Sequence, residues 1–348
     1  MQSVQPAQPL ARVEGAGVAW RSLGLLFGLA AVIVVGLLSL RIGSIDISTR
    51  DAWDALFNYN SDIYNQTVVR TLRLPRTVIA LAVGAALAIA GTTMQGVTRN
   101  PLADPSILGV SSGATFAVVT VTYYLHLSAP SQYVWFAFAG ALAASLLVFA
   151  IGSTGNDGAS PIKLALAGVV LSAFLGSWTS ALLLLDENTL DTVRFWLAGS
   201  VVGRDLSTFW TLSPFLIGGS VVLLFLGHQL NVLDLGEDSA RALGMQTGRI
   251  RLFCSVLVVI VVGSAVSIAG PIAFVGLATP HIVRSIIGPD YRWVLPYSAL
   301  AGALLLTVAD ISGRVLLRPA EIQVGIMTAL VGAPFLIYLA RHTVMERG

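Results

Sequence analysis

The amino-acid sequence predicts an all-α polytopic membrane protein with about ten transmembrane helices. Of its 348 residues, 55% are hydrophobic and only 11% are charged, whereas an ordinary soluble domain carries about 25% charged residues. The mean hydropathy is +0.81, and the apolar residues lie in long runs without charge. Such runs suit membrane helices of roughly 20 residues, while a transmembrane barrel requires apolar and polar residues to alternate. The composition therefore excludes a soluble enzyme.

The apolar runs divide into ten expected spans, which follow a short lead-in, residues 1–19, that we expect to be flexible. Asn100-Pro101 and Pro105 end the second span because proline cannot continue a helix. The run 105–156 is too long for one crossing and turns at 128–131. The expected spans are 20–40, 75–95, 106–126, 132–152, 162–185, 207–228, 252–270, 272–287, 294–316 and 322–340, with a C-terminal tail at 343–348.

Three polar segments between the spans have structure of their own. Residues 41–73 are rich in aromatic side chains and predict one short interfacial helix. Residues 186–205 predict a short surface helix around Phe195-Trp196. In the charged segment 231–248, apolar residues are spaced for two short amphipathic helices joined at Gly236.

An even number of spans puts both termini on one side of the membrane. With cytoplasmic termini, the 20 basic residues divide into 11 inside and 9 outside, which only slightly favours this orientation under the positive-inside rule. Five of the outer nine lie in or beside the first loop, at Arg41, Arg50, Arg70, Arg73 and Arg76. A cluster of arginines on that side requires a specific reason.

Two segments in different spans resemble each other. Residues 84–91 (GAALAIAG) and 263–270 (GSAVSIAG) agree at five of eight positions. Their expected spans cross in opposite directions, which is the pattern of an inverted repeat. Chance agreement in a chain rich in alanine and glycine is the alternative.

The sequence lacks several chemical motifs. It contains no G-x-x-x-x-G-K-[ST] phosphate-binding loop and no H-E-x-x-H zinc motif. No charged residue stands near the middle of a span, where ion-coupled transporters usually keep one. Asp310, late in the ninth span, is predicted to pair with Arg314 one helical turn later, and the single cysteine, Cys254, is predicted to be buried. The net charge of +2 comes from loops and does not indicate nucleic-acid binding.

Several ordered motifs resemble the FecCD/BtuC-type permease family over residues 20–342. The motifs are Arg73-Leu-Pro-Arg76, residues 84–91 with Gln95, Arg99-Asn-Pro-Leu-Ala-Asp-Pro105 with Leu108-Gly109, Phe195-Trp-Leu-Ala-Gly-Ser200, residues 233–244 and 270–284, Ala309-Asp310 with Arg314, and Glu321-Ile-Gln-Val-Gly325 with Gly332-Ala-Pro334. The resemblance implies a BtuC-like ten-helix permease with an inverted repeat, located in the bacterial plasma (inner) membrane.

The same resemblance implies a function and a set of partners. The chain would be the permease subunit of a binding-protein-dependent ABC importer that moves ferric-siderophore complexes inward. It would bind no cofactor or metal of its own and would not be an enzyme, because ATP and Mg would belong to two separate ATPase subunits. Its other partners would be a second permease, identical or paralogous, an extracytoplasmic binding protein and membrane lipid. A vitamin B12 or haem permease is the nearer alternative, and a secondary transporter is the more distant one.

Residue roles also follow from the resemblance. Arg73, Arg76 and Arg314 would receive acidic residues of the binding protein. The segment 231–248 would form coupling helices against the ATPase, with Glu237, Ala240, Arg241 and Gly244 in contact or close packing. Asn100 and Leu102, completed by Ser160 and Pro161, would form the cytoplasmic gate, and Phe195 and Trp196 would lie at the outer mouth of the pathway.

Overall fold

The computed structural model describes residues 11–154 and 161–345, which contain helices and no strands. Seven described helices are long and apolar enough to cross a membrane, and three shorter apolar helices bring the number to ten. The ten helices are α1 (Ala11–Arg41), α4 (Leu74–Thr98), α5 (Val110–Leu125), α6 (Pro130–Gly152), α7 (Pro161–Leu185), α9 (Leu206–Leu224), α12 (Thr247–Ala269), α13 (Val275–Ile287), α14 (Tyr291–Leu316) and α15 (Val324–Met345). The prediction of an all-α polytopic fold is confirmed.

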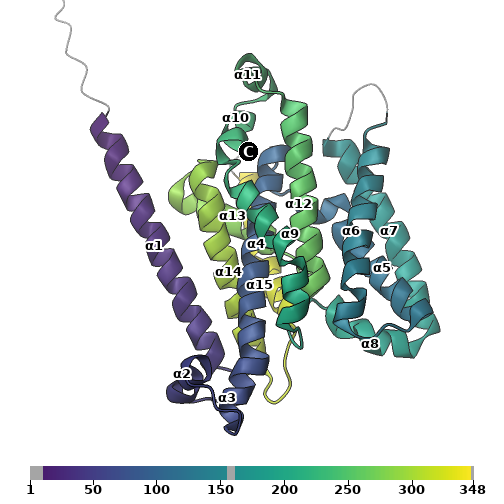
Figure 1. Cartoon of the computed structure of the whole chain (residues 1–348). Helices are drawn as coiled ribbons and strands as arrows, with labels where there is room; N and C mark the ends of the chain where they lie inside the picture. Colours follow the sequence, from purple (N-terminus) through teal and green to yellow (C-terminus); the bar gives the residue numbers. More distant parts are fainter. Residues whose placement is uncertain (1–10, 155–160, 346–348) are drawn as a thin grey trace, which may run out of the picture.

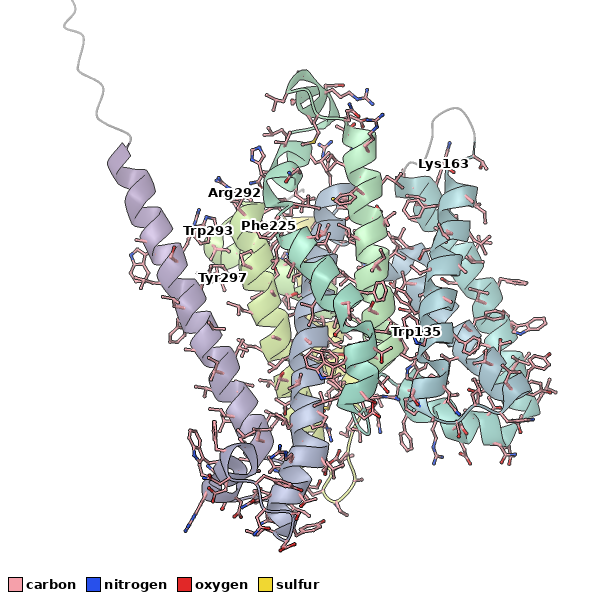
Figure 2. All side chains as sticks on the ribbon, in the orientation of Figure 1. Trp135, Lys163, Phe225, Arg292, Trp293 and Tyr297 are labelled. Atoms are coloured by element: carbon pink, nitrogen blue, oxygen red, sulfur yellow. The ribbon has the colours of Figure 1, made fainter. Side chains whose placement is uncertain are left out.

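Short helices cap the two ends of this bundle (Figure 1). At one end lie α10 (Gly227–Asp234) and α11 (Glu237–Ala242), and we call this the α10–α11 end. At the other, the α2–α8 end, lie α2 (Thr49–Phe57), α3 (Tyr64–Val68) and α8 (Glu187–Leu197). The first described turn of α1 points toward the α10–α11 end, and Lys163 and Arg292 are at the same end (Figure 2).

Helix boundaries differ from the expected ones at both ends of the chain and before α4. Helix α1 continues back to Ala11, through part of the segment expected to be a flexible lead-in, because that stretch has no proline to stop it. Residues 1–10 and 346–348 lie outside the described residues. A π-helical turn, η1 (Val69–Arg73), joins α3 directly to α4. Pro75 does not interrupt α4, because it falls in the first turn, where its N–H would have no partner within the helix.

Helix α4 is the centre of the molecule, and α1 and α7 are at its periphery. We compared the most apolar 18-residue window of each helix. In the helix that includes α4, 78% of this window is buried, against 17% in α1 and 22% in α7. Gly84 of α4 lies directly against the backbone of Gly302 in α14, and Gly91 against that of Gly276 in α13. Small residues let membrane helices approach this closely, so the glycines place α4 in contact with the second half of the chain.

The two halves of the chain repeat one arrangement in opposite directions. Each has a long helix, a break, and a shorter helix whose N-cap is left-handed: α4 leads to Gly109 and α5, and α12 leads to Phe274 and α13. The breaks fall at opposite ends because α4 and α12 run in opposite directions. Gly84 faces α14, and its counterpart Gly263 faces α6. Helix α6 has the same position in the first half of the chain as α14 has in the second half. This arrangement supports the inverted repeat that the similarity of residues 84–91 and 263–270 indicated.

Candidate functional site

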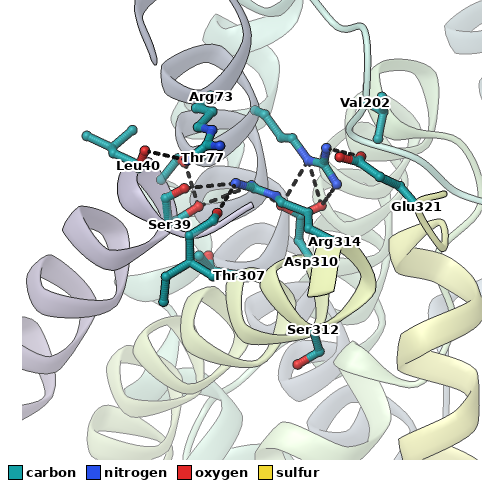
Figure 3. Close-up of polar contacts among 12 residues, drawn as sticks. Ser39, Leu40, Arg73, Thr77, Val202, Thr307, Asp310, Ser312, Arg314 and Glu321 are labelled. Atoms are coloured by element: carbon teal, nitrogen blue, oxygen red, sulfur yellow. Dashed lines mark hydrogen bonds and ion pairs between the residues drawn. The ribbon is translucent and has the colours of Figure 1, made fainter. Parts of the chain in front are cut away.

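A cluster of charged side chains lies at the α2–α8 end and joins two distant parts of the sequence, 73–76 and 310–321. We call Arg73, Arg76, Arg314, Asp310 and Glu321 the arginine cluster. Figure 3 labels all of them except Arg76. The Nε of Arg76 donates to both carboxylate oxygens of Asp310, at 2.8 and 3.0 Å. Its Nη1 lies 2.5 Å from Oε2 of Glu321, and Arg314 pairs with Asp310. The pairing of Asp310 with Arg314 confirms the prediction from their spacing.

Two of these arginines also hold the end of α1. Arg73 donates to the carbonyl oxygens of Leu40, at 3.0 Å, and of Arg41, at 2.5 Å, and also to that of Ile45. Arg314 donates to the carbonyl oxygen of Ser39 at 2.8 Å. The last carbonyl groups of a helix have no partner within the helix and carry partial negative charge. The two guanidinium groups therefore cap α1.

Burial distinguishes the arginine cluster from an exposed docking patch. Arg73 and Arg76 are each 7% exposed and Arg314 is 2% exposed. The three arginines expected to receive a partner's acidic residues are thus engaged within the chain, and a partner's carboxylate must displace an existing contact. The pKa of Glu321 reflects this engagement: burial would raise it, but the hydrogen bond and charge of Arg76, with a hydrogen bond from Ser44, hold it below its ordinary value.

A cavity of about 580 Å³ opens beside the arginine cluster. Its wall includes Arg73, Arg76, Arg314 and Glu321, together with Arg204 and Asp205 from the loop before α9. With Asp310 behind the wall, four arginines face three carboxylates, a formal excess of +1. Within the described residues, Arg73 has only backbone carbonyls as hydrogen-bond partners. The cavity therefore favours an anionic group.

The α10–α11 end carries the second polar element. The two short helices are separated at Gly236, whose φ of 108° is a conformation that glycine adopts readily. This agrees with the prediction of two helices joined at Gly236, although α10 begins at Gly227, before the expected 231. Glu237 pairs with Arg241 at 2.6 Å and with Arg251 at 3.4 Å. Ala240 is fully buried, and Gly244 is exposed with open space around it.

The residues expected to form the gate lie at the same end. Helix α4 ends at Arg99 in a left-handed conformation, with φ 52°. In the turn that follows, Asn100 Oδ1 accepts the backbone N–H of Leu102 at 3.0 Å, and the Leu102 side chain is 58% exposed. Pro161 is the first residue of α7. Ser160 lies outside the described residues.

Phe195 and Trp196, expected together at the mouth of the pathway, face different sides of α8. Phe195 is 52% exposed, whereas Trp196 is 1% exposed. The Trp196 ring packs edge-on against Tyr133, with ring centroids 6.2 Å apart, and its indole N–H points to the carbonyl oxygen of Ser267 at 3.5 Å. Adjacent residues of an amphipathic helix face different directions, so Trp196 packs within this chain while the Phe195 side chain is available to line a pathway. The position of both residues at the outer mouth stays a prediction.

Several contacts at the two polar ends gave no local signal in the sequence. The Arg76 and Asp310 contact joins residues 234 positions apart, and the Arg76 and Glu321 contact joins residues 245 apart. Asn231 and Asp290, which meet at the α10–α11 end, were likewise not singled out. The spacing rule that found Asp310 with Arg314 applies only within one helix.

The fold and its two polar ends define a polytopic helical membrane protein, and comparison with known proteins identifies its family. The chain belongs to the FecCD transport family, whose model matches residues 31–342. It is 45% identical over 319 residues to the Fe(3+)-citrate import system permease protein YfmD of Bacillus subtilis (strain 168), covering 91% of this chain and 94% of that protein. It is 44% identical over 315 residues to the ferric enterobactin transport system permease protein FepD of Escherichia coli (strain K12), covering 90% and 93%.

A solved structure has the same fold. It is described as an inward-facing conformation of a metal-chelate type ABC transporter. The likeness has a TM-score of 0.81 at 31% identity and covers 91% of this chain and 98% of that chain. The arrangement of helices in this chain is therefore that of a membrane permease.

Proposed function

We propose that this chain is the membrane-spanning permease subunit of a binding-protein-dependent ABC importer that carries ferric-siderophore complexes into a bacterial cell. The observation that carries the proposal is the match over nearly the whole chain to permeases named for ferric chelates, together with the fold of a metal-chelate type ABC transporter. The absence of charged residues from the middle of the described spans also suits a passive pathway that does not bind ions.

The energy for import would enter at the α10–α11 end, which we place in the cytoplasm together with both termini. A separate ATPase subunit would bind α10 and α11, contacting the half-buried Glu237 and the exposed Arg241 and Gly244 while Ala240 packs inward. ATP and Mg would be held by two such subunits, since the sequence has no phosphate-binding loop.

The binding protein would dock on the α2–α8 end, outside the cell. The excess positive charge of the 580 Å³ cavity supports an acidic side chain of the binding protein as its occupant. Such a carboxylate would compete with Glu321 for Arg76 and would reach Arg73, which has no carboxylate partner among the described residues. Docking by this route exchanges one ion pair for another.

A charge placed in the cavity wall tests this docking without disturbing the buried ion pairs. Leu72 is 60% exposed and lines the cavity. Leu72→Glu should weaken binding of the binding protein about tenfold or more, because like charges facing each other disfavour docking, whereas the uncharged control Leu72→Gln should bind like the wild type. Surface plasmon resonance with the complex embedded in nanodiscs measures the affinity of both variants for the binding protein. Equal affinity of the glutamate and glutamine variants would contradict docking of an acidic group here.

The pathway would form between this chain and a second permease, either another copy or a paralogue. Helix α7 supports this arrangement because its apolar side chains are largely uncovered, with Val170 68% exposed and Phe174 62% exposed. The turn at Asn100 and Leu102, completed by Ser160 and Pro161 from the sequence before the fifth span, would close the pathway on the cytoplasmic side. Phe195 would lie near its outer mouth.

The substrate class is tested by uptake in a bacterium from which the gene is deleted. Uptake of radiolabelled iron bound to siderophores should fall to the background level, while uptake of haem and cobalamin continues. Loss of cobalamin or haem uptake with retention of iron uptake would instead assign the chain to the alternative vitamin B12 or haem permeases. Re-expression of the gene should restore whichever uptake was lost.

A further inference from the structure

Helix α10 is fixed to the start of α14 by two independent contacts. A Cβ added to Gly227, the first residue of α10, would lie 2.9 Å from the backbone N and Cα atoms of Arg292, so the two backbones touch. One turn further along α10, Asn231 uses both halves of its amide. Its Nδ2 donates to Oδ1 of Asp290 at 2.6 Å, and its Oδ1 accepts the backbone N–H of Tyr291 at 2.8 Å. The start of α14 therefore has to follow α10.

Asp290 makes this junction rigid from the side of α14. It is the N-cap of α14, accepting the backbone N–H of Arg292 at 3.0 Å. Its carboxylate also pairs with the Arg292 guanidinium at 2.8 Å. The hydrogen bond from Arg292 and then that from Asn231 lower the pKa of Asp290 to about 2. The group therefore stays ionised at neutral pH, where a charge-assisted hydrogen bond to Asn231 is stronger than a neutral one.

A second set of contacts runs from Tyr291 to α4. The Tyr291 hydroxyl accepts a hydrogen bond from Nη2 of Arg284 in α13, at 3.3 Å, and the guanidinium carbon lies 5.3 Å from the centre of the Tyr291 ring. Nη1 of Arg284 donates to Oε1 of Gln95 in α4 at 2.6 Å. Gln95 is 1% exposed, and next to it Gly96 packs against the Tyr291 ring and Leu230 of α10.

Gln95 in turn holds the turn that contains the proposed gate. Its backbone carbonyl accepts the N–H of Arg99, which ends α4, and that of Asn100 at 3.2 Å. The same residue therefore receives the polar contacts from α13 through its side chain and fixes the first residues of the gate turn through its backbone. A continuous path of hydrogen bonds runs from α10 to Asn100.

We propose that Asn231, Asp290, Tyr291, Arg284 and Gln95 form a positioning relay that transmits a displacement of α10 to the turn after α4. The proposal rests on the proposed function, in which an ATPase moves α10 and the turn at Asn100 and Leu102 gates the pathway. Packed elements joined by short hydrogen bonds carry coupling between sites, and this path is continuous from one element to the other. The contacts along this path are among these five residues and with the neighbouring backbone, so the role proposed for them is to position other groups.

The relay is tested by the accessibility of the gate turn in the complete complex with its ATPase. A cysteine at Leu102→Cys, labelled with a maleimide, reports on the turn, because Leu102 is exposed and the native Cys254 is fully buried. The labelling rate should change between the ATP-bound and nucleotide-free wild-type background. Asn231→Leu should reduce that ATP-dependent change about tenfold, as expected for loss of a hydrogen bond to a charged group, with the ATPase still bound and active.

A swapped pair separates the relay from damage to folding. Asn231→Asp alone sets two carboxylates against each other. Combined with Asp290→Asn it restores a donor and an acceptor at the same positions and keeps a good N-cap, so the double variant should regain the ATP-dependent labelling change. Arg194→Gln, which removes an exposed ion pair with Asp191 in α8, away from the relay, should behave like the wild type.

The outcomes distinguish the relay from the function on which it rests. A wild-type complex with an ATP-dependent change that Asn231→Leu leaves intact would overturn the relay alone, as would a double variant no better than Asn231→Asp. If no ATP-dependent change occurs in the wild type, or no ATPase assembles with the chain, the proposed function fails and the relay fails with it.

Discussion

At the scale of single residues, the arginine cluster explains why basic side chains gather at the α2–α8 end. Arg73, Arg76 and Arg314 are needed there for the structure itself, because they cap α1 and neutralise Asp310 and Glu321. Arg73 and Arg76 also belong to the five arginines in or beside the first loop whose position required a specific reason. The reason lies in contacts between residues more than 200 positions apart, which no local pattern reveals.

Removing the central carboxylate should destabilise the fold. Asp310 is fully buried between Arg76 and Arg314, and breaking a buried pair leaves an uncompensated charge at a cost of about 3–5 kcal/mol. Asp310→Asn should therefore lower the thermal unfolding temperature in detergent, followed by the fluorescence of the chain's tryptophans. Asp46→Asn is the matched control, since the Asp46 pair with Arg318 is exposed. Equal unfolding temperatures for the two variants would contradict a structural role for Asp310.

The Glu321 contact should depend on pH in one direction. Its pKa is lower in the folded protein than its ordinary value, which is about 4.3 for a free glutamate. A lowered pKa means that the ionised contact stabilises the fold above that value and is lost as the pH falls through the folded pKa. The difference in unfolding temperature between wild type and Glu321→Gln should be constant from about pH 7 to pH 5.5 and shrink below about pH 4. A difference that grows on acidification would contradict this pairing.

At the scale of elements, the helices followed from the sequence more closely than their contacts did. Long apolar runs, with breaks at Asn100-Pro101 and at the charged segment around Gly236, were enough to place most spans. The π-helical turn before α4 was not predicted, and its last residue, Arg73, donates to backbone carbonyls at the end of α1. Phe195 and Trp196 could not be separated without knowing which face of α8 meets α12 and α6.

The contact between α4 and α14 should tolerate no added side chain at its closest point. Gly84 lies against the backbone of Gly302, which cannot move aside as a flexible side chain would. Gly84→Val should therefore separate the helices and lower the unfolding temperature markedly, by an overpacking cost of at least about 1–3 kcal/mol. Gly218→Val in α9 is the control, because nothing lies within 4 Å of a Cβ there. Similar losses in both variants would show that the effect is not specific to this crossing.

At the scale of the whole molecule, α14 connects the two polar ends. Its first residues bind α10 through Asn231, and its last turns carry Asp310 and Arg314 of the arginine cluster. Between them the helix packs on α4 through Gly302 and Gly84. A single rigid helix pair therefore joins the proposed docking surface to the proposed ATPase contact, which suits a protein whose two partners act on opposite sides of a membrane.

In the proposed function, transport through this chain is driven by an ATPase bound at the α10–α11 end. The most direct measurement is uptake of a radiolabelled ferric siderophore into proteoliposomes containing the permease pair, the ATPase and the binding protein. We expect accumulation that requires ATP hydrolysis and continues after ionophores dissipate every ion gradient. Accumulation that persists without the ATPase and stops when the gradients are dissipated would contradict the account and assign the chain to the secondary transporters.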